Sequence, residues 1–394
     1  MVNLTHDRCC GCGACAAICP KMAISMQESY CGFIYPVIDN SKCVNCNLCD
    51  KVCPELSAIK LSSPKVVYAA CNKDRQELST CASGGAATAF CRSILHCDGV
   101  VYGCSQSNYH TIRHIRIDCE GDLDLLKGSK YVQSNMGTIY TDVKSDLLSG
   151  RKVLFIGTPC QVGALYGFLQ KKYQNLYTVD LVCHGVPSQA MLRSAVESET
   201  GPSDDLFVNF RWKTQFGIQF GIQFGNNKRI IKSIPAIRDA YMTAFLKGLS
   251  FRENCHNCKY SQGMRVGDIT IGDFWGLGKD SLSGIDPKDG VSLIMVNTDC
   301  GAGLWKNTED SFIAEIRDFE EAVKYNWNLD APSPRPANKD KFLKIYTQQG
   351  MEQATRSCVQ RYRIESMGVV RLIRQIPLLN KTLGLGMRVV RRII

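Results

Sequence analysis

The sequence between residues 65 and 200 alternates between short apolar runs and longer segments with apolar residues at helical spacing. The short runs are bounded by turn residues, which is typical of buried strands. They lie at residues 65–71, 99–102, 152–156 and 176–182, and the segments with helical spacing lie at 86–96, 138–149, 162–172 and 189–199. Strands that alternate with helices run parallel in one sheet, so we expect an α/β domain with a mainly parallel sheet.

Two turns in this region each carry a cysteine. Residues 157–161 follow one predicted strand, and residues 183–188 follow the next. The carboxyl ends of parallel strands meet at one edge of a sheet, and open α/β sheets hold their ligands there. We therefore expect Cys160 and Cys183 to be near neighbours at that edge.

The second half of the chain contains fewer predicted elements. A short internal repeat at residues 207–224 predicts an extended hairpin. The Pro-rich segment 331–337 predicts a stiff extended spacer. It separates an α/β body, residues 65–330, from a helical and basic C-terminal region, residues 338–394.

Composition narrows the class of protein. The chain has 394 residues, is 45% hydrophobic and 21% charged, and contains 22 cysteines. These fractions are those of a soluble globular protein, and no apolar run is long enough to span a bilayer. Many thiols without an export signal predict a reducing cytosol and metal ligation instead of a disulfide scaffold.

The positive charge is concentrated at the C-terminus. The net charge is +10, and residues 361–394 carry eight basic residues and one acidic residue, which gives +7 and leaves +3 for the rest. The body is therefore nearly neutral, and no nucleic-acid partner is expected. Arg371, Arg374, Lys381 and Arg388 share one helical face, which predicts contact with the inner face of a membrane, or packing on the body or on a partner subunit.

The cysteines near the N-terminus form one pattern twice. The chain reads Cys9-x-x-Cys12-x-x-Cys15-x-x-x-Cys19-Pro20 and then Cys43-x-x-Cys46-x-x-Cys49-x-x-x-Cys53-Pro54. This is the bacterial ferredoxin run, in which the fourth cysteine of each motif ligates the other motif's [4Fe–4S] cluster. One cluster is therefore assigned to Cys9, Cys12, Cys15 and Cys53, and the other to Cys43, Cys46, Cys49 and Cys19.

Zinc and disulfides are the alternatives for these cysteines. Zinc sites use two pairs of ligands, not three ligands with a remote fourth followed by proline, so iron–sulfur clusters are the better interpretation. We predict an α+β ferredoxin-like domain at residues 1–60, in which the clusters supply stability that a small core lacks. Cys10 and Cys31 fall outside the pattern and are interpreted as small apolar residues.

Two glycine-containing segments of the body suit an anionic ligand. Ser83 is a suitable N-cap for the predicted helix 86–96, and Gly84 and Gly85 would let a phosphate approach free backbone N–H groups. Ser129 and Lys130 lie beside a glycine and also suit an anion. The alternatives are an ordinary turn for the first segment and a solvated loop for the second.

A further pair of cysteines, Cys255 and Cys258, lies beyond the predicted hairpin. With Cys160 and Cys183 they make four thiols in one domain. The spacing allows a third [4Fe–4S] cluster, a four-cysteine zinc site or simply buried thiols.

Together these motifs resemble the beta subunits of coenzyme F420-reducing hydrogenase and related dehydrogenases. The resemblance spans residues 1–330 and rests on the ferredoxin pair and on six further motifs. These are Ser83-Gly-Gly, Gly128-Ser-Lys-Tyr-Val-Gln-Ser134, Gly157-Thr-Pro-Cys-Gln161, Cys183-His-Gly-Val-Pro-Ser188, Cys255-x-x-Cys258 and Gly267-Asp-Ile-Thr-Ile-Gly-Asp-Phe-Trp-Gly276. It implies FAD, a third [4Fe–4S] cluster on Cys160, Cys183, Cys255 and Cys258, and hydride exchange with a deazaflavin. Family members act on other substrates too, among them the plant hydroxymethyl-chlorophyll reductase.

The predicted function is that of an iron–sulfur flavoprotein oxidoreductase. Clusters move one electron at a time and hydride chemistry moves two, so a flavin is the natural converter between them. We expect Asp273 and Trp275 to line the site, whereas His184 and His256 are interpreted as structural. The expected partners are a redox protein or subunit and a small-molecule substrate. The alternatives are an electron-transfer subunit of a larger complex, and a membrane-associated redox partner for polysaccharide synthesis.

Overall fold

The computed structural model describes residues 4–215, 217–226, 229–277 and 286–362. The basic residues of the predicted amphipathic tail, from Arg371 onward, lie outside these ranges. The predicted contact of that tail with a membrane, the body or a partner subunit therefore also lies outside the described residues. Within the described ranges, no helix is both long enough and apolar enough to cross a membrane.

The N-terminal module contains two short helices and one hairpin. Helix α1 (Ala14–Ile18) is followed by strands β1 (Ile24–Glu28) and β2 (Ile34–Ile38), which pair antiparallel, and then by helix α2 (Leu48–Val52). The residue that ends α1 is Cys19, and the residue that ends α2 is Cys53. Each one-turn helix therefore carries the chain from the three closely spaced cysteines of its motif to the fourth.

The body is built on a mixed sheet, which in the described part of the chain has eight strands in the order β13-β3-β12-β11-β7-β6-β4-β5. The strands are β3 (Val66–Asn72), β4 (Val100–Asn108), β5 (Thr111–Ile117), β6 (Val153–Gly157), β7 (Leu176–Leu181), β11 (Ile269–Asp273), β12 (Ser292–Val296) and β13 (Phe312–Arg317). Strands β4, β6, β7 and β11 run parallel, but the pairs on both sides of this group are antiparallel. The prediction of a mainly parallel sheet is wrong, because the later strands β12 and β13 enter on either side of β3 in the opposite direction.

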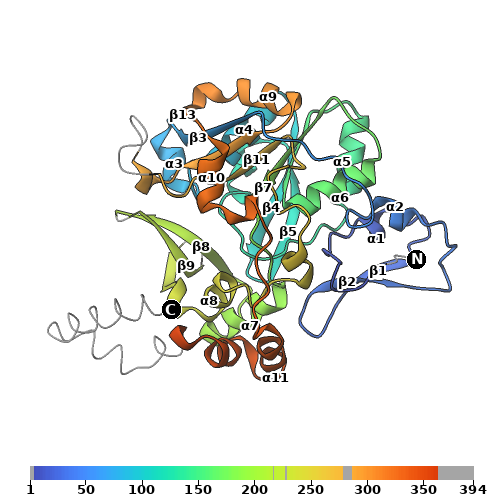
Figure 1. Cartoon of the computed structure of the whole chain (residues 1–394), viewed down its shortest axis with the longest axis vertical. Helices are drawn as coiled ribbons and strands as arrows, with labels where there is room; N and C mark the ends of the chain where they lie inside the picture. The colour runs from blue at the N-terminus through green and yellow to red at the C-terminus, as the bar shows by residue number, and fades with distance from the viewer. Residues whose placement is uncertain (1–3, 216, 227–228, 278–285, 363–394) are drawn as a thin grey trace.

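Helices cover both faces of the sheet (Figure 1). Along β4 and β6, alternate side chains point to opposite faces. Val100, Tyr102, Val153 and Phe155 pack against α5 (Ile139–Leu148) and α6 (Pro159–Leu169), whereas Val101 and Leu154 pack against α4 (Ala86–Leu95) and α9 (Asp299–Lys306). Helix α6 occupies residues 159–169 instead of the predicted 162–172, since Pro159 fills its first position and Thr158 forms a capping box with Gln161.

A second sheet lies beside the first and extends from it in Figure 1. It contains β8 (Leu206–Thr214), β9 (Gly217–Asn226) and β10 (Arg229–Pro235), so the predicted hairpin is confirmed and gains a third strand. Helices α7 (Gln189–Thr200), α8 (Ala240–Leu246) and α11 (Lys339–Cys358) share its hydrophobic core. Helix α11 is interrupted at Gly350, whose φ is 81°.

The remaining helices of the body are short. Helix α3 (Arg75–Thr80) precedes α4, and α10 (Phe319–Tyr325) follows β13. The Pro-rich segment 331–337, which the sequence predicts to be a stiff extended spacer, contacts the body. Its Ser333 is buried and donates to the backbone oxygen of His184 at 2.6 Å.

Candidate functional site

The cysteines assigned to the second ferredoxin cluster surround one small cavity near the surface. Cys19, Cys43, Cys46 and Cys49, here called the distal cysteines, line a cavity of about 20 Å³. Cys46 is exposed and Cys49 is buried. The remote Cys19 therefore joins the three cysteines of the other motif, as the crossed assignment requires.

The other ferredoxin set is buried deeper. Cys9, Cys12, Cys15 and Cys53, here called the proximal cysteines, are each exposed by less than a tenth. Burial, together with the nearby Cys9, Cys53 and distal Cys49, raises the pKa of Cys15 to about 12. The two sets are therefore close neighbours within the module.

The four cysteines of the body also converge. Cys160, Cys183, Cys255 and Cys258, here called the inner cysteines, line one cavity of about 30 Å³. Parallel pairing of β6 with β7 brings the first two together at the sheet edge, and a short helical turn at Glu253–Asn257 carries the third. Burial raises the pKa of Cys255 to about 12 and that of Cys258 to about 11. These thiols are neutral at pH 7, so a metal would have to displace their protons.

Within the described ranges, no three cysteine, histidine or carboxylate side chains form a site for a single metal ion. The thiolates of a [4Fe–4S] cluster bind different irons, so they are spaced more widely than the ligands of one ion. The inner cavity is also lined by Tyr260, whose hydroxyl is buried and has no hydrogen-bond partner in the described structure.

The N-terminal module is fixed to the body by Arg252, which is fully buried. Its guanidinium donates to the backbone oxygens of Cys9 at 3.3 Å and Ile34 at 3.0 Å, and to Gln133 Oε1 at 2.8 and 3.0 Å. It also lies over the rings of Phe33 and Tyr35, 5.0 and 4.7 Å from their centroids. Gly11 is required beside it, because φ is +66° and a Cβ would lie 2.5 Å from Arg252 Nη2.

Helix α6 lies close against the module as well. A Cβ on Gly167 would lie 2.4 Å from the backbone oxygen of Val52 in α2. Tyr140 of α5 donates to the backbone oxygen of Cys12 at 3.0 Å. The proximal cysteines are therefore held directly against the helices that cover the sheet.

A larger cavity of about 320 Å³ lies at the carboxyl ends of β6, β7 and β11. It shares Thr158, Cys160, Cys183 and His184 with the inner cavity, so two of the four inner cysteines form part of its wall. Ser83, Gly85, Ser129, Lys130, Asp273 and Trp275 line it, as the sequence predicts. Gly84 lies against β3 and β12, where a Cβ would come within 2.4 Å of the backbone oxygen of Ala70.

The amino end of α4 opens into this cavity. Gly85, with φ 85°, is the N-cap and no side chain caps the helix. The prediction that Ser83 is the cap is wrong, because its hydroxyl donates to the backbone oxygen of Val291 at 3.1 Å. Ala86, Ala87 and Thr88 of the first turn line the cavity, so its backbone N–H groups are available to an anion.

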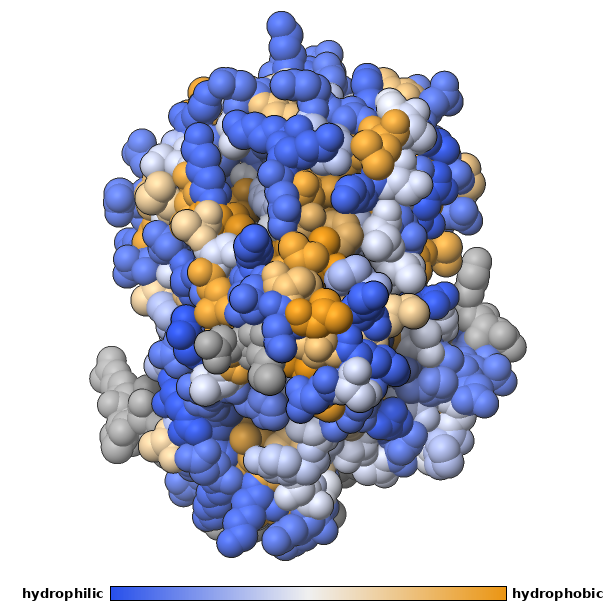
Figure 2. All heavy atoms as spheres, turned by 90° about the vertical axis from the view of Figure 1, so that its right-hand side faces the viewer, coloured by the Kyte–Doolittle hydropathy of each residue, from blue (hydrophilic) through white to orange (hydrophobic). Residues whose placement is uncertain are grey.

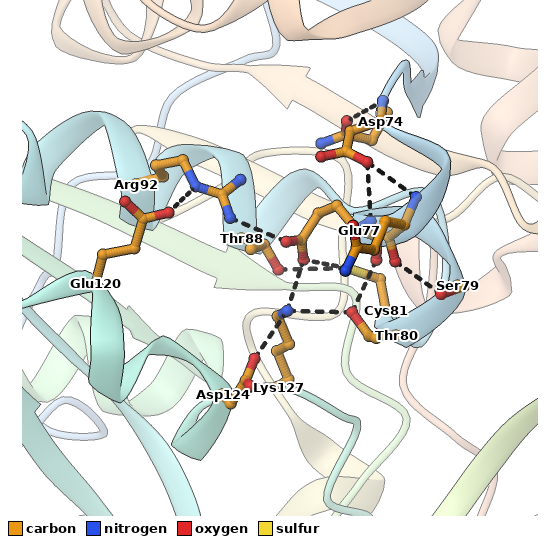
Figure 3. A network of polar contacts seen from close by, with 12 residues as sticks. Asp74, Glu77, Ser79, Thr80, Cys81, Thr88, Arg92, Glu120, Asp124 and Lys127 are labelled. Atoms are coloured by element: carbon orange, nitrogen blue, oxygen red, sulfur yellow. Dashed lines mark hydrogen bonds and ion pairs between the residues drawn. The ribbon is translucent and has the colours of Figure 1, made fainter.

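A buried carboxylate links the start of α4 to the loop that carries Ser129 and Lys130 (Figure 3). Glu77 accepts from Arg92 of α4 and from Lys127 of that loop, each at 2.9 Å. Cys81 and Thr88 extend the network, with Cys81 Sγ 3.2 Å from Glu77 Oε1. Although burial raises the pKa of Glu77, the bonds from its two cationic partners outweigh burial and lower it overall. The network fixes the loop relative to the helix.

The motifs at 128–134 and 157–161 are joined by hydrogen bonds on the cavity wall. Gln161 accepts from the backbone N–H of Thr158 at 3.0 Å and donates to Ser134 Oγ at 2.9 Å. His114 lies 2.9 Å from both Ser134 Oγ and the backbone oxygen of Ile156. Burial lowers the pKa of His114 to about 4, so the ring is neutral and donates from Nε2 to the carbonyl.

The charged side chains of the cavity already form hydrogen bonds with other groups of the protein. Asp273 accepts two bonds from Arg211, at 2.8 and 3.0 Å, while Arg211 Nε is buried and has no partner in the described structure. Lys130 donates to the backbone oxygens of Leu126 and Lys127, and burial lowers its pKa. Trp275 is 36% exposed at the edge of the cavity.

Several site residues could not be found from the sequence. Arg211 lies in a strand that has no glycine or cysteine motif. Arg252 and Gln133 bond to the N-terminal module, more than ninety residues away from them in the chain. Cys10 lines the inner cavity, which the interpretation as a small apolar residue did not foresee. His256, in contrast, contacts Lys339 and the backbone of Ser333, in agreement with a structural role.

Comparisons with known proteins identify two families. The family that describes the C terminus of the coenzyme F420 hydrogenase/dehydrogenase beta subunit matches residues 150–322. The 4Fe–4S dicluster domain matches residues 8–56. Among solved structures, the chain is similar to one in the F420-reducing [NiFe] hydrogenase complex from Methanosarcina barkeri, with 20% identity and a TM-score of 0.46 over 75% of this chain and 92% of that chain. No curated protein matches the chain.

Proposed function

Because the chain belongs to the family of coenzyme F420 hydrogenase/dehydrogenase beta subunits with an N-terminal ferredoxin domain, we propose that it is an iron–sulfur flavoprotein oxidoreductase. It would pass electrons between its [4Fe–4S] clusters and a coenzyme F420-like or other organic substrate. The observation that carries the proposal is the order of the sites: the distal cysteines lie beside the proximal cysteines, the proximal cysteines lie beside the inner cysteines, and the inner cavity shares part of its lining with the large cavity.

The inner cysteines fit a third [4Fe–4S] cluster. Four thiols from three separate segments line one cavity, and the unpartnered hydroxyl of Tyr260 lies in its wall. A [4Fe–4S] cluster needs four converging thiolates and is tuned by hydrogen bonds to their sulfurs. Tyr260 would supply such a bond, because its hydroxyl has no other acceptor in the described structure.

The large cavity fits FAD. Its volume of about 320 Å³ lies within the range of ligand sites in proteins, and it lies at the sheet edge where α/β folds hold ligands. The uncapped start of α4 and the Lys130 side chain would face the phosphates, and the free Arg211 Nε–H would donate to a polar group of the ring system. A flavin here would supply the conversion between one-electron transfer and hydride exchange.

The chain's own residues orient the ligands and exclude water. The two bonds to Asp273 keep the Arg211 guanidinium in one orientation. Neutral His114 stabilises the cavity wall through its hydrogen bonds with Ser134 Oγ and the backbone oxygen of Ile156. His184 lines both cavities, and burial lowers its pKa, so it is uncharged between the inner cysteines and the larger cavity. None of these groups adds net charge between the two sites.

The distal end of the path suits a redox partner protein. Cys46 is exposed, and three apolar side chains of the same module, Met22, Val37 and Val44, are 84%, 45% and 57% exposed. Figure 2 shows the face that carries this module, with apolar groups near its centre among polar ones. Electrons would enter or leave at this face, which agrees with the chain being either an enzyme or one subunit of a larger redox complex.

Metal and flavin content test the proposal. Protein purified without oxygen should contain about twelve irons, from three clusters of four, and about one flavin per chain. Zinc in place of iron, or iron without flavin, would contradict the proposal. An Arg211→Met variant should lose flavin and keep its iron, whereas the surface variant Arg116→Met should keep both.

A further inference from the structure

The inner cavity has a fifth thiol, that of Cys10, which comes from the N-terminal module. Cys10 is 5% exposed and packs with Cys12 in the hydrophobic core formed by α5 and α6. The small core of the module itself holds other cysteines, Cys15 and Cys49. Cys10 therefore lies at the boundary between the module and the body, and on the side of the body.

Cys10 is a neighbour of one ligand from each of two sets. It packs with the proximal Cys12 in a hydrophobic core against which the inner Cys160 also packs, and it lines the inner cavity together with Cys160. A thiol has one hydrogen to donate, and the two neighbouring sulfurs are acceptors once they are bound to iron. Cys10 therefore lies between these two ligands, with one S–H group that either sulfur could accept.

The backbone around Cys10 is held by the body. Gln133 donates to the backbone oxygen of Cys10 at 2.9 Å, and Tyr140 donates to that of Cys12 at 3.0 Å. Between them, Gly11 has φ +66° and lies against Arg252 with no room for a side chain. The backbone that carries the Cys10 side chain is consequently held by groups that do not belong to the ferredoxin module.

We propose that Cys10 is a positioning residue that links the proximal and inner clusters and raises the reduction potential of both by donating its S–H hydrogen bond to their ligand sulfurs. Hydrogen bonds to cluster sulfurs stabilise the extra negative charge of the reduced state, so they raise the potential. The bond is made to whichever sulfur carries more negative charge, and Cys10 itself remains a thiol throughout. This inference rests on the proposed function, because it requires a cluster at the inner cysteines.

The test uses three variants of the whole chain, purified without oxygen, and a redox titration followed by electron paramagnetic resonance. Cys10→Ala removes the donor and should lower two of the three cluster potentials, while the distal potential stays unchanged. Cys10→Ser retains a hydrogen-bond donor and should restore both potentials. Cys31→Ala is the matched control, because Cys31 is the other buried extra cysteine of the module and packs in a different core.

Iron content separates the possible outcomes. All variants should keep the full iron content of the unmodified chain. Loss of about four irons in Cys10→Ala would make Cys10 a cluster ligand and overturn the proposal. Equal potentials in the Cys10→Ala variant and the unmodified chain would also overturn it. An unmodified chain with only about eight irons would instead contradict the proposed function, since the inner cluster would then be absent.

Discussion

Arg252 gives the sharpest prediction about how the N-terminal module is attached. It is fully buried, and no carboxylate forms an ion pair with it among the described residues. The proximal Cys9 lies close enough that Arg252 lowers the pKa of its thiol, although burial raises that pKa overall. The negative charge that balances Arg252 would therefore be that of the proximal cluster and its thiolates. Arg252→Met keeps the apolar length of the side chain and removes every donor.

The magnitude follows from the contacts. The substitution leaves the backbone oxygens of Cys9 and Ile34 and the amide oxygen of Gln133 without this donor. A buried acceptor without a partner costs about 1–3 kcal/mol, and breaking a buried charged network costs about 3–5 kcal/mol. We expect the free energy of unfolding to fall by about 4 kcal/mol. With an m value of about 3 kcal/mol/M, the urea midpoint should fall by about 1 M or more.

The assay is urea unfolding of the cluster-loaded protein without oxygen, followed by cluster absorbance and tryptophan fluorescence. Arg193→Ala is the matched control, because Arg193 of α7 also bridges to the module, through Glu28 at 3.9 Å, but both side chains are largely exposed. Such an exposed pair contributes less than about 1 kcal/mol, so the control midpoint should hardly move. Equal midpoints for the two variants would refute the reasoning.

Three further predictions concern single positions. Gly11→Ala should disturb cluster binding strongly, because its Cβ would lie 2.5 Å from Arg252. The control Gly13→Ala should cost only about 1 kcal/mol of backbone strain, because φ is +78° there and no atom lies within 4 Å of the added Cβ. Similar losses of iron in both variants would contradict the packing argument. Burial raises the pKa of Asp239 to about 7, so the folded protein binds this proton more tightly than the unfolded chain and loses stability as pH rises from about 4 to 7. Asp239→Asn should therefore raise the thermal midpoint at pH 8 more than at pH 5.5, and an equal effect at both pH values would count against it. Cys255→Ser should remove about four irons and leave the flavin bound, and unchanged iron would exclude Cys255 as a ligand.

Local spacing explains what the sequence could predict. The ferredoxin motifs fix which cysteines lie close together, and Cys19 and Cys53 end the one-turn helices that carry them across. The shared cavity of Cys160 and Cys183 follows from two strand-turn-helix units in succession. These features depend on spacings and turn residues within short segments, so they are visible in the chain.

Long-range packing explains the rest. The direction of β12 and β13 depends on strands more than two hundred residues away in the chain, so the mixed sheet could not be read from local patterns. The helix after Ser83 is capped by Gly85 because the Ser83 hydroxyl is taken by Val291 of a distant segment. The role of Cys10 likewise depends on how the module docks against α6.

An anaerobic electron count tests the central claim most directly. The claim is that one chain holds two ferredoxin clusters, an inner cluster and a flavin in a continuous row. Stepwise reduction should take up about five electrons per chain, one for each cluster and two for the flavin. A total of about three would mean that the large cavity holds no flavin, and about two would leave only the ferredoxin clusters, so either result would contradict the account.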